Sequence, residues 1–231
     1  MDEESSNIEE NKESVYVGPI LGRKIFNAAR GGLFFSGLVS GPREIGKSSY
    51  CLKSLHAALI ALGYSEDAAW EKCLDSIKFK LIDVVNYLED AAKKDDREIC
   101  LIWDDCRISG GGSVWFHSPK LVTRLTAVLD TVRSSLSSML LTAPSSSGLL
   151  SVLNSYDDYI IKVSFGSRGG WYRLGRGYIQ RSLPSGQKRI YRSFEDIYSC
   201  YLPNEIYSRY NVMRKNALKD ALQNLRKEVK E

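Results

Sequence analysis

The stretch Gly41-Pro42-Arg43-Glu44-Ile45-Gly46-Lys47-Ser48 matches the pattern G-x-x-x-x-G-K-[ST] at every fixed position. The two glycines let the backbone bend closely enough for consecutive N–H groups to point at phosphate oxygens. Lys47 can then act catalytically on the β- and γ-phosphates, while Ser48 offers a hydroxyl to Mg²⁺. The pattern predicts ATP with Mg²⁺ as the ligand, bound by this loop and by the following Ser49.

The flanking segments fit a strand that enters the loop and a helix that leaves it. Residues 33–40 are an apolar run of strand length. After the loop, apolar residues recur at helical spacing up to Gly63, namely Cys51, Leu55, Ala58, Leu59 and Leu62. A phosphate in the loop would then lie on the N-terminal N–H groups of that helix. A glycine-rich surface turn before an ordinary helix is the alternative interpretation.

A second apolar run, residues 99–103, is followed directly by two acids, Asp104 and Asp105. A buried strand that ends in a carboxylate can supply the partner that holds Mg²⁺ beside a phosphate loop. We therefore predict that Asp104 is the magnesium-associated aspartate and that Asp105 is the base that activates water. Alternatively, the two acids end the strand in a turn and have no catalytic role.

Further elements follow the same alternation of strand and helix. Ser118-Pro119 should begin a helix, and residues 138–142 and 159–163 have the composition of core strands. Thr142 and Ser145, at the end of the first of these strands, are candidates for sensing the γ-phosphate or positioning water. Glycines 110–112 are placed at the mouth of the site. Arg124 and Arg133 are candidate arginine fingers for a neighbouring subunit, although solvated helix arginines are commoner. The succession predicts an α/β fold with a mainly parallel sheet between helices.

The chain of 231 residues has a net charge of +4 that is unevenly distributed. Residues 1–14 hold six acids and one lysine, which predicts a disordered acidic tail. No apolar run is long enough for a membrane span, and the five cysteines form no C-x-x-C pair, so we expect a cytoplasmic protein with reduced thiols.

Residues 168–192 contain seven basic residues and no acid, with tyrosines and a tryptophan among them. They predict a β-hairpin with a turn at residues 184–186. Basic side chains neutralise phosphates and aromatic rings stack on bases, so the hairpin is a candidate DNA-binding segment. Its candidate contacts are Arg168, Arg173, Arg176, Arg181, Lys188 and Arg189. A positively charged sheet edge is an equal alternative. Residues 204–231 should form a helix that packs near Asn204 and frays at its end.

On these motifs, residues 30–165 resemble P-loop ATPases of the RecA, HerA/FtsK and AAA division, which keep an extra strand between the phosphate-loop strand and the strand ending in the aspartate. The Asp104-Asp105 pair and the basic, tyrosine-rich C-terminal part resemble small ATPases of archaeal viruses and plasmids, some of them DnaA-like. The family often has Asp-Glu where this chain has Asp-Asp. The helical lid with a sensor arginine, expected of AAA enzymes, is not identifiable in the sequence.

The resemblance implies a homo-oligomeric ATPase that acts on DNA in replication, segregation or packaging of a mobile element, with a replication or packaging protein as a further partner. An ATP-gated switch that recruits a partner and hardly hydrolyses ATP is the alternative. The expected organisation is an acidic tail (1–14), a P-loop ATPase core (15–165), and a basic hairpin with a C-terminal helix attached to the core (166–231).

Overall fold

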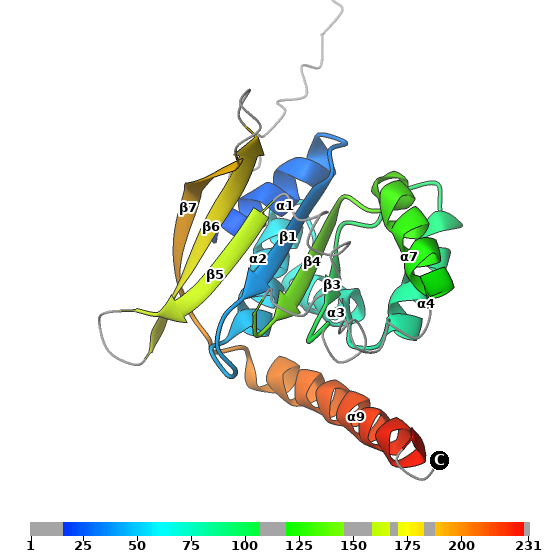
Figure 1. The fold of residues 1–231 in the computed structure, drawn as a ribbon. Helices are drawn as coiled ribbons and strands as arrows, with labels where there is room; N and C mark the ends of the chain where they lie inside the picture. The colour runs from blue at the N-terminus through cyan, green and yellow to red at the C-terminus, as the bar shows by residue number, and fades with distance from the viewer. Residues whose placement is uncertain (1–15, 107–118, 146–158, 167–170, 183–187, 229–231) are drawn as a thin grey trace, which may run out of the picture.

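A seven-stranded sheet with the order β2-β3-β4-β1-β5-β6-β7 forms the centre of the computed structural model (Figure 1). The structure describes residues 16–106, 119–145, 159–166, 171–182 and 188–228. The strands are β1 (Phe35–Ser40), β2 (Ile77–Lys78), β3 (Leu101–Trp103), β4 (Ser138–Ala143), β5 (Tyr159–Phe165), β6 (Tyr172–Ser182) and β7 (Lys188–Ser199). The first five strands in the sheet order pair in parallel, whereas β6 and β7 pair antiparallel. The predicted α/β fold with a C-terminal hairpin is confirmed.

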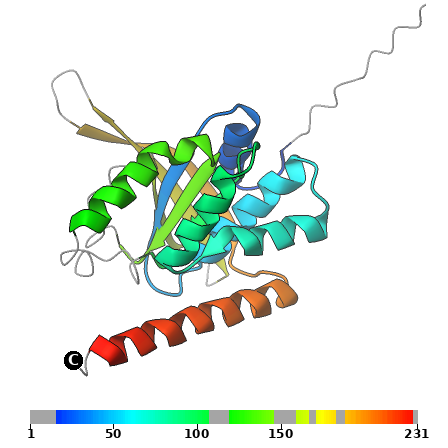
Figure 2. The same ribbon diagram turned by 90° about the vertical axis from the view of Figure 1, so that its right-hand side faces the viewer.

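Helices cover both faces of the parallel part of the sheet (Figures 1 and 2). They are α1 (Ile20–Arg30), α2 (Lys47–Ala61), α3 (Glu66–Ser76), α4 (Leu81–Ala92) and α7 (Pro119–Thr131), and a short 3-10 turn, Val132–Ser134, follows α7. The C-terminal helix is α9 (Asn204–Glu228). Alternate residues of β3 face opposite ways, so that Ile102 packs in the core under α1, α2 and α3 while Trp103 packs in the core under α4 and α7. Both faces of this strand are therefore buried.

Three elements between the chain start and β3 were not predicted from the sequence. They are α1, α3 and the two-residue strand β2. The helix α3 begins at a conventional cap, because the Ser65 hydroxyl accepts a hydrogen bond from the backbone N–H of Ala68 at 3.4 Å. Within the described residues, no helix is both long and apolar enough to cross a membrane.

The C-terminal helix α9 lies across the end of the sheet where the Gly41–Ser48 loop is found (Figure 1). Its Ile206, Tyr210 and Ala217 are buried in the same core as α1, α2 and α3. The strand β7 also joins this core through Phe194 and Tyr198. The segment after residue 166 thus shares both the sheet and the core with the rest of the chain.

Candidate functional site

Two residues far apart in sequence meet at the end of the Gly41–Ser48 loop. The Ser48 hydroxyl lies 2.7 Å from Oδ1 and 2.9 Å from Oδ2 of Asp104, across a separation of 56 positions. Ser48 is in the first turn of α2, and Asp104 directly follows β3. The structure therefore brings together the two residues that the sequence predicted to hold Mg²⁺.

The loop itself is closed by Lys47 and shaped by Gly46. Lys47 is 7 % exposed, and its Nζ donates to the carbonyl oxygens of Gly41 at 3.0 Å and Pro42 at 2.9 Å. Burial lowers the pKa of Lys47, and the nearby Asp105 and Asp104 carboxylates partly oppose this shift. Gly46 has φ 93°, and a Cβ there would lie 2.4 Å from Sγ of Cys200. Glycine is therefore required by both the backbone angle and the packing.

Asp104 is fully buried and accepts hydrogen bonds from three hydroxyl groups. Besides Ser48, Thr142 donates to Oδ1 at 2.5 Å and Tyr210 donates to Oδ2 at 2.8 Å. A carboxylate has about four acceptor positions, so three donors leave room for one more partner. The carboxylate is thus fixed in place while remaining able to interact with a hydrated cation.

Asp105 is held in a less common conformation beside this cluster. Its φ is 47°, a left-handed value that costs a non-glycine residue about 1–2 kcal/mol, and its N–H donates to Oγ1 of Thr142 at 2.9 Å. Its Oδ2 lies 3.5 Å from Nη2 of Arg214 on α9. Burial, followed by the neighbouring Asp104 charge, raises the pKa of Asp105.

A cavity of about 690 Å³ opens between the loop and α9. Arg43, Glu44, Gly46, Lys47, Ser48, Ser49 and Asp105 from the predicted set line it. Pro42 is exposed and Ile45 is buried, and neither lines the cavity. Most of the predicted nucleotide-binding residues therefore face one space.

Thr142 lies between Asp104 and Asp105. Its side chain is fully buried, and its hydroxyl is used twice, as a donor to Asp104 and as an acceptor from the N–H of Asp105. This geometry connects Thr142 to both aspartates, and its predicted role toward the γ-phosphate stays a prediction. Ser145 is half-buried, Arg124 lines a separate apolar cavity between α4 and α7, Arg133 is exposed, and glycines 110–112 lie outside the described residues.

Sequence reasoning missed the part of the cavity wall that α9 provides, which includes Tyr207, Tyr210, Arg214 and Leu218. Tyr210 is 6 % exposed and Arg214 is 50 % exposed. They are four positions apart, so they project from the same side of the helix. The sequence signal that could have pointed to this wall is Tyr210 itself, a tyrosine among mostly aliphatic residues on the apolar side of the predicted C-terminal helix.

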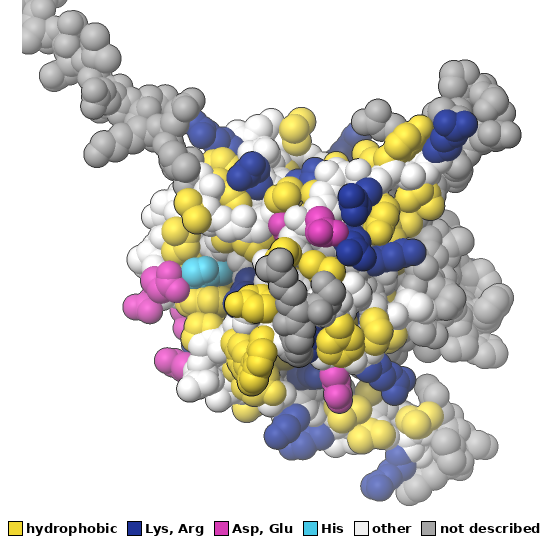
Figure 3. All heavy atoms as spheres, turned by 90° about the vertical axis from the view of Figure 1, so that its left-hand side faces the viewer, with side chains coloured by type: hydrophobic (Ala, Val, Ile, Leu, Met, Phe, Trp, Pro, Cys, Tyr) yellow, Lys and Arg dark blue, Asp and Glu magenta, His cyan; other side chains and the backbone are white. Residues whose placement is uncertain are grey.

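The predicted DNA-binding segment forms β6, β7 and the end of the sheet. Figure 3 views this side and shows basic side chains among hydrophobic ones. Arg189 and Arg192 are exposed, whereas Nε of Arg176 lies 2.6 Å from Oε2 of Glu195 and the Arg173 guanidinium stacks over the Phe165 ring at 4.5 Å. Arg168, the turn at 184–186 and the side chains of Arg181 and Lys188 lie outside the described part.

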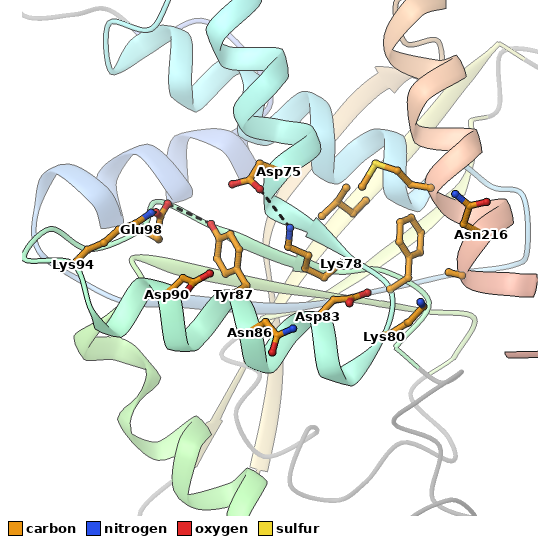
Figure 4. A pocket seen from close by; sticks show the side chains of 14 residues that line it. Asp75, Lys78, Lys80, Asp83, Asn86, Tyr87, Asp90, Lys94, Glu98 and Asn216 are labelled. Atoms are coloured by element: carbon orange, nitrogen blue, oxygen red, sulfur yellow. Dashed lines mark hydrogen bonds and ion pairs between the residues drawn. The ribbon is translucent and has the colours of Figure 1, made fainter. Parts of the chain in front are cut away.

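A second cavity, of about 430 Å³, lies between β2, α4 and α9 (Figure 4). Lysines and acids alternate around it, and Asn216 of α9 forms part of its wall. Three of the acids make ion pairs with lysines, Asp75 with Lys78, Asp90 with Lys93 and Glu98 with Lys94. The charges around this cavity therefore largely balance one another.

No protein-family model matches this chain. The chain is 26% identical over 203 residues to uncharacterized protein B-251 of Sulfolobus spindle-shape virus 1, with 84% of this chain and 79% of that protein aligned. Among solved structures, it is similar to the N-terminal domain of zonular occludens toxin from Neisseria meningitidis, with a TM-score of 0.42 and 12% identity over 75% of this chain and 97% of that one. It is also similar to the flagellar accessory protein FlaH from Methanocaldococcus jannaschii, with a TM-score of 0.40 and 12% identity over 73% of this chain and 94% of that one.

Proposed function

We propose that this chain is a Mg²⁺-dependent ATP-binding protein that hydrolyses ATP. One observation carries the proposal: the Ser48 hydroxyl and the buried Asp104 carboxylate meet at 2.7 Å directly beside the Gly41–Ser48 loop. These groups provide oxygen ligands, which Mg²⁺ prefers, and Asp104 retains capacity for a further interaction. The donor set thus fits magnesium, which when bound would neutralise charge on the phosphate oxygens.

The remaining residues fit the other requirements of phosphoryl transfer. The loop N–H groups and the N-terminus of α2 would cradle the phosphates, and Lys47 would exchange its two loop carbonyls for β- and γ-phosphate oxygens. Asp105 would accept a proton from water as the water oxygen bonds to the γ-phosphorus and the bond to the ADP oxygen breaks. Thr142 would fix the positions of Asp104 and Asp105 relative to each other through its two hydrogen bonds.

The order of the strands also supports this assignment. β4 lies between β1, which enters the loop, and β3, which ends in Asp104. An inserted strand at this place is what the sequence resemblance to the RecA, HerA/FtsK and AAA division implies. The similar viral protein supports a role for this chain in a mobile element. We further propose that the chain acts there as a homo-oligomer in the host cytoplasm.

Replacing Asp105 with asparagine should reduce single-turnover ATP hydrolysis about 100-fold or more while ATP still binds, because the amide cannot accept the proton. The measurement is release of phosphate from pre-bound ATP with Mg²⁺. Asp90→Asn, a change at an exposed acid of α4, is the matched control and should keep the wild-type rate. Equal rates for Asp105→Asn and the wild type would remove Asp105 from catalysis.

A second candidate function is an ATP-gated switch that binds a partner and hydrolyses ATP hardly at all. The specific observation in its favour is that Asp105 lies within ion-pair distance of Arg214, which would restrain a catalytic base. Tight ATP binding together with a negligible hydrolysis rate in the wild type would favour this switch.

We further propose that the exposed side of β7 contacts DNA. Arg189 and Arg192 are exposed there, and Tyr191, which shares a face of the strand with Arg189, is 43 % exposed and could stack on a base. Removing both arginines should weaken DNA binding and lower the slope of log K against log salt by roughly 1 to 2. The matched control is Arg209→Ala with Arg97→Ala, since neither arginine lies on β7. An unchanged salt slope would contradict the proposed contact.

A further inference from the structure

The helix α9 separates the two cavities described above. Arg214 and Leu218 face the cavity of the Gly41–Ser48 loop, whereas Met213 and Asn216 line the cavity beside α4. Among the described side chains of α9, Ile206, Tyr210 and Ala217 are the buried hydrophobic ones. The helix is thus held to the core along a narrow strip, and one of its three anchors touches the magnesium-associated aspartate.

We propose, on the basis of the proposed ATP-binding function, that α9 belongs to the nucleotide site. Tyr210 is a positioning residue that orients Asp104, and Arg214 leaves Asp105 to contact the terminal phosphate. Binding of Mg²⁺-ATP therefore tightens the docking of α9 on the core.

Tyr210 has the geometry of a positioning residue. Its ring is buried and lies 5.9 Å from the Phe79 ring, measured between centroids, and Phe79 follows β2. Its hydroxyl donates to Oδ2 of Asp104 at 2.8 Å. Without this donor, Oδ2 would keep only the longer contact from Ser48, at 2.9 Å. The tyrosine hydroxyl therefore fixes the rotation of the carboxylate that would face a hydrated magnesium ion.

Arg214 has a weak partner that a phosphate can replace. Its Nη2 lies 3.5 Å from Oδ2 of Asp105, and the arginine side chain is 50 % exposed. Such an exposed, long ion pair contributes little, whereas a guanidinium can form two parallel hydrogen bonds with a phosphate. Arg214 and Lys47, both positively charged, border the same cavity. A polyanion in this cavity would relieve their repulsion, and Asp105 would become free to act on water.

The docking of α9 is well suited to such control. Beyond Ala217, the leucines of α9 are more than half exposed, with Leu218 at 53 %, Leu222 at 56 % and Leu225 at 54 %. Two ion pairs, Arg209 with Glu71 and Lys80 with Asp220, supplement the narrow apolar contact. Because exposed ion pairs stabilise little, a ligand that binds only the docked helix can shift its population measurably.

The test combines equilibrium binding with hydrogen exchange on the full chain. Arg214→Ala should weaken Mg²⁺-ATP binding roughly tenfold or more, and ADP binding much less, because the γ-phosphate contact is lost. Tyr210→Phe should reduce the gain in ATP affinity that Mg²⁺ provides by roughly fivefold. Wild-type amides in residues 204–217 should exchange more slowly with Mg²⁺-ATP than without it, and this protection should be reduced in Arg214→Ala.

Arg226→Ala removes an equal charge from an exposed position near the end of α9, and Tyr201→Phe removes the hydroxyl of an exposed tyrosine. Both should keep the wild-type ratio of ATP to ADP affinity. The inference would be overturned if Arg214→Ala kept the wild-type ratio of ATP to ADP affinity, or if hydrogen exchange of the α9 amides did not respond to nucleotide. The proposed ATP-binding function would still stand in that case, provided that Lys47→Ala loses ATP binding. If the wild type and Lys47→Ala bind ATP equally, the proposed function fails as well.

Discussion

Replacing Asp196 with alanine is expected to lower the free energy of unfolding by about 4 kcal/mol, because buried donors lose a charged acceptor. Asp196 on β7 is 6 % exposed. Its carboxylate accepts from the backbone N–H groups of Ile20 at 2.7 Å and Leu21 at 3.1 Å, at the start of α1. It also accepts from the Tyr50 hydroxyl of α2 at 2.5 Å. The Asp196 side chain thus joins β7 to the N-terminus of α1 and to α2, the helix that follows the Gly41–Ser48 loop.

Chemical denaturation of the wild type and Asp196→Ala, monitored by circular dichroism, measures this effect. Glu195→Ala is a matched control, since it removes the same charge from the neighbouring position, where Glu195 pairs with Arg176 in solvent. The control should change stability far less, because exposed ion pairs contribute little. Similar losses in both variants would show that Asp196 is not the connection described here.

The local parts of the fold and site could be predicted from the sequence because their signals are short. Residues 41–48 specify a loop between strand and helix, and the apolar run before Asp104 specifies a buried strand. Parallel strands align their carboxyl ends, so the meeting of Ser48 with Asp104 followed from these two segments. The β-hairpin was also visible, because alternating residues on each side of a turn signal mark its strands.

The missing parts depend on contacts that sequence periodicity does not encode. Two residues, Ile77–Lys78, are too few to show the alternation of a strand, and β2 exists because it pairs with β3. In the sequence, Tyr210 is simply one apolar position of a predicted helix. Its hydrogen bond to Asp104 joins residues 106 positions apart, and only the structure shows it. From its sequence, Arg214 would be taken for a solvated helix arginine. Only the placement of α9 beside the Gly41–Ser48 loop shows that Arg214 lines the same cavity. No sequence motif marks Asp196, because the groups that donate hydrogen bonds to its carboxylate lie on two distant helices, α1 and α2.

The C-terminal segment supports the Gly41–Ser48 loop as well as extending the sheet. The Tyr198 hydroxyl donates to the carbonyl of Gly46 at 3.2 Å, and Lys53 of α2 donates to the carbonyl of Ser199 at 2.9 Å. The Tyr50 and Tyr198 rings stack with centroids 4.4 Å apart. The end of β7 therefore packs against the Gly41–Ser48 loop and α2. The chain then continues into α9, which lines the cavity beside this loop.

Replacing Lys47 with alanine is expected to weaken Mg²⁺-ATP binding roughly 100-fold or more. In the absence of ligand, Nζ is satisfied by the Gly41 and Pro42 carbonyls, and the buried ammonium can transfer these bonds to phosphate oxygens. Two charge-assisted hydrogen bonds contribute about 3 kcal/mol or more, and each 1.4 kcal/mol is a factor of ten in affinity. Lys93→Ala, which removes an exposed lysine of α4, should bind as the wild type does.

The most direct test of the central claim is a titration of the wild type, Lys47→Ala and Lys93→Ala with ATP, in the presence of Mg²⁺ and of a chelator. We predict binding by the wild type and Lys93→Ala that Mg²⁺ strengthens, and its loss in Lys47→Ala although that variant remains folded. Binding that is equal in all three proteins, or that Mg²⁺ does not affect, would contradict the assignment of the Gly41–Ser48 loop and Asp104 as a nucleotide and magnesium site.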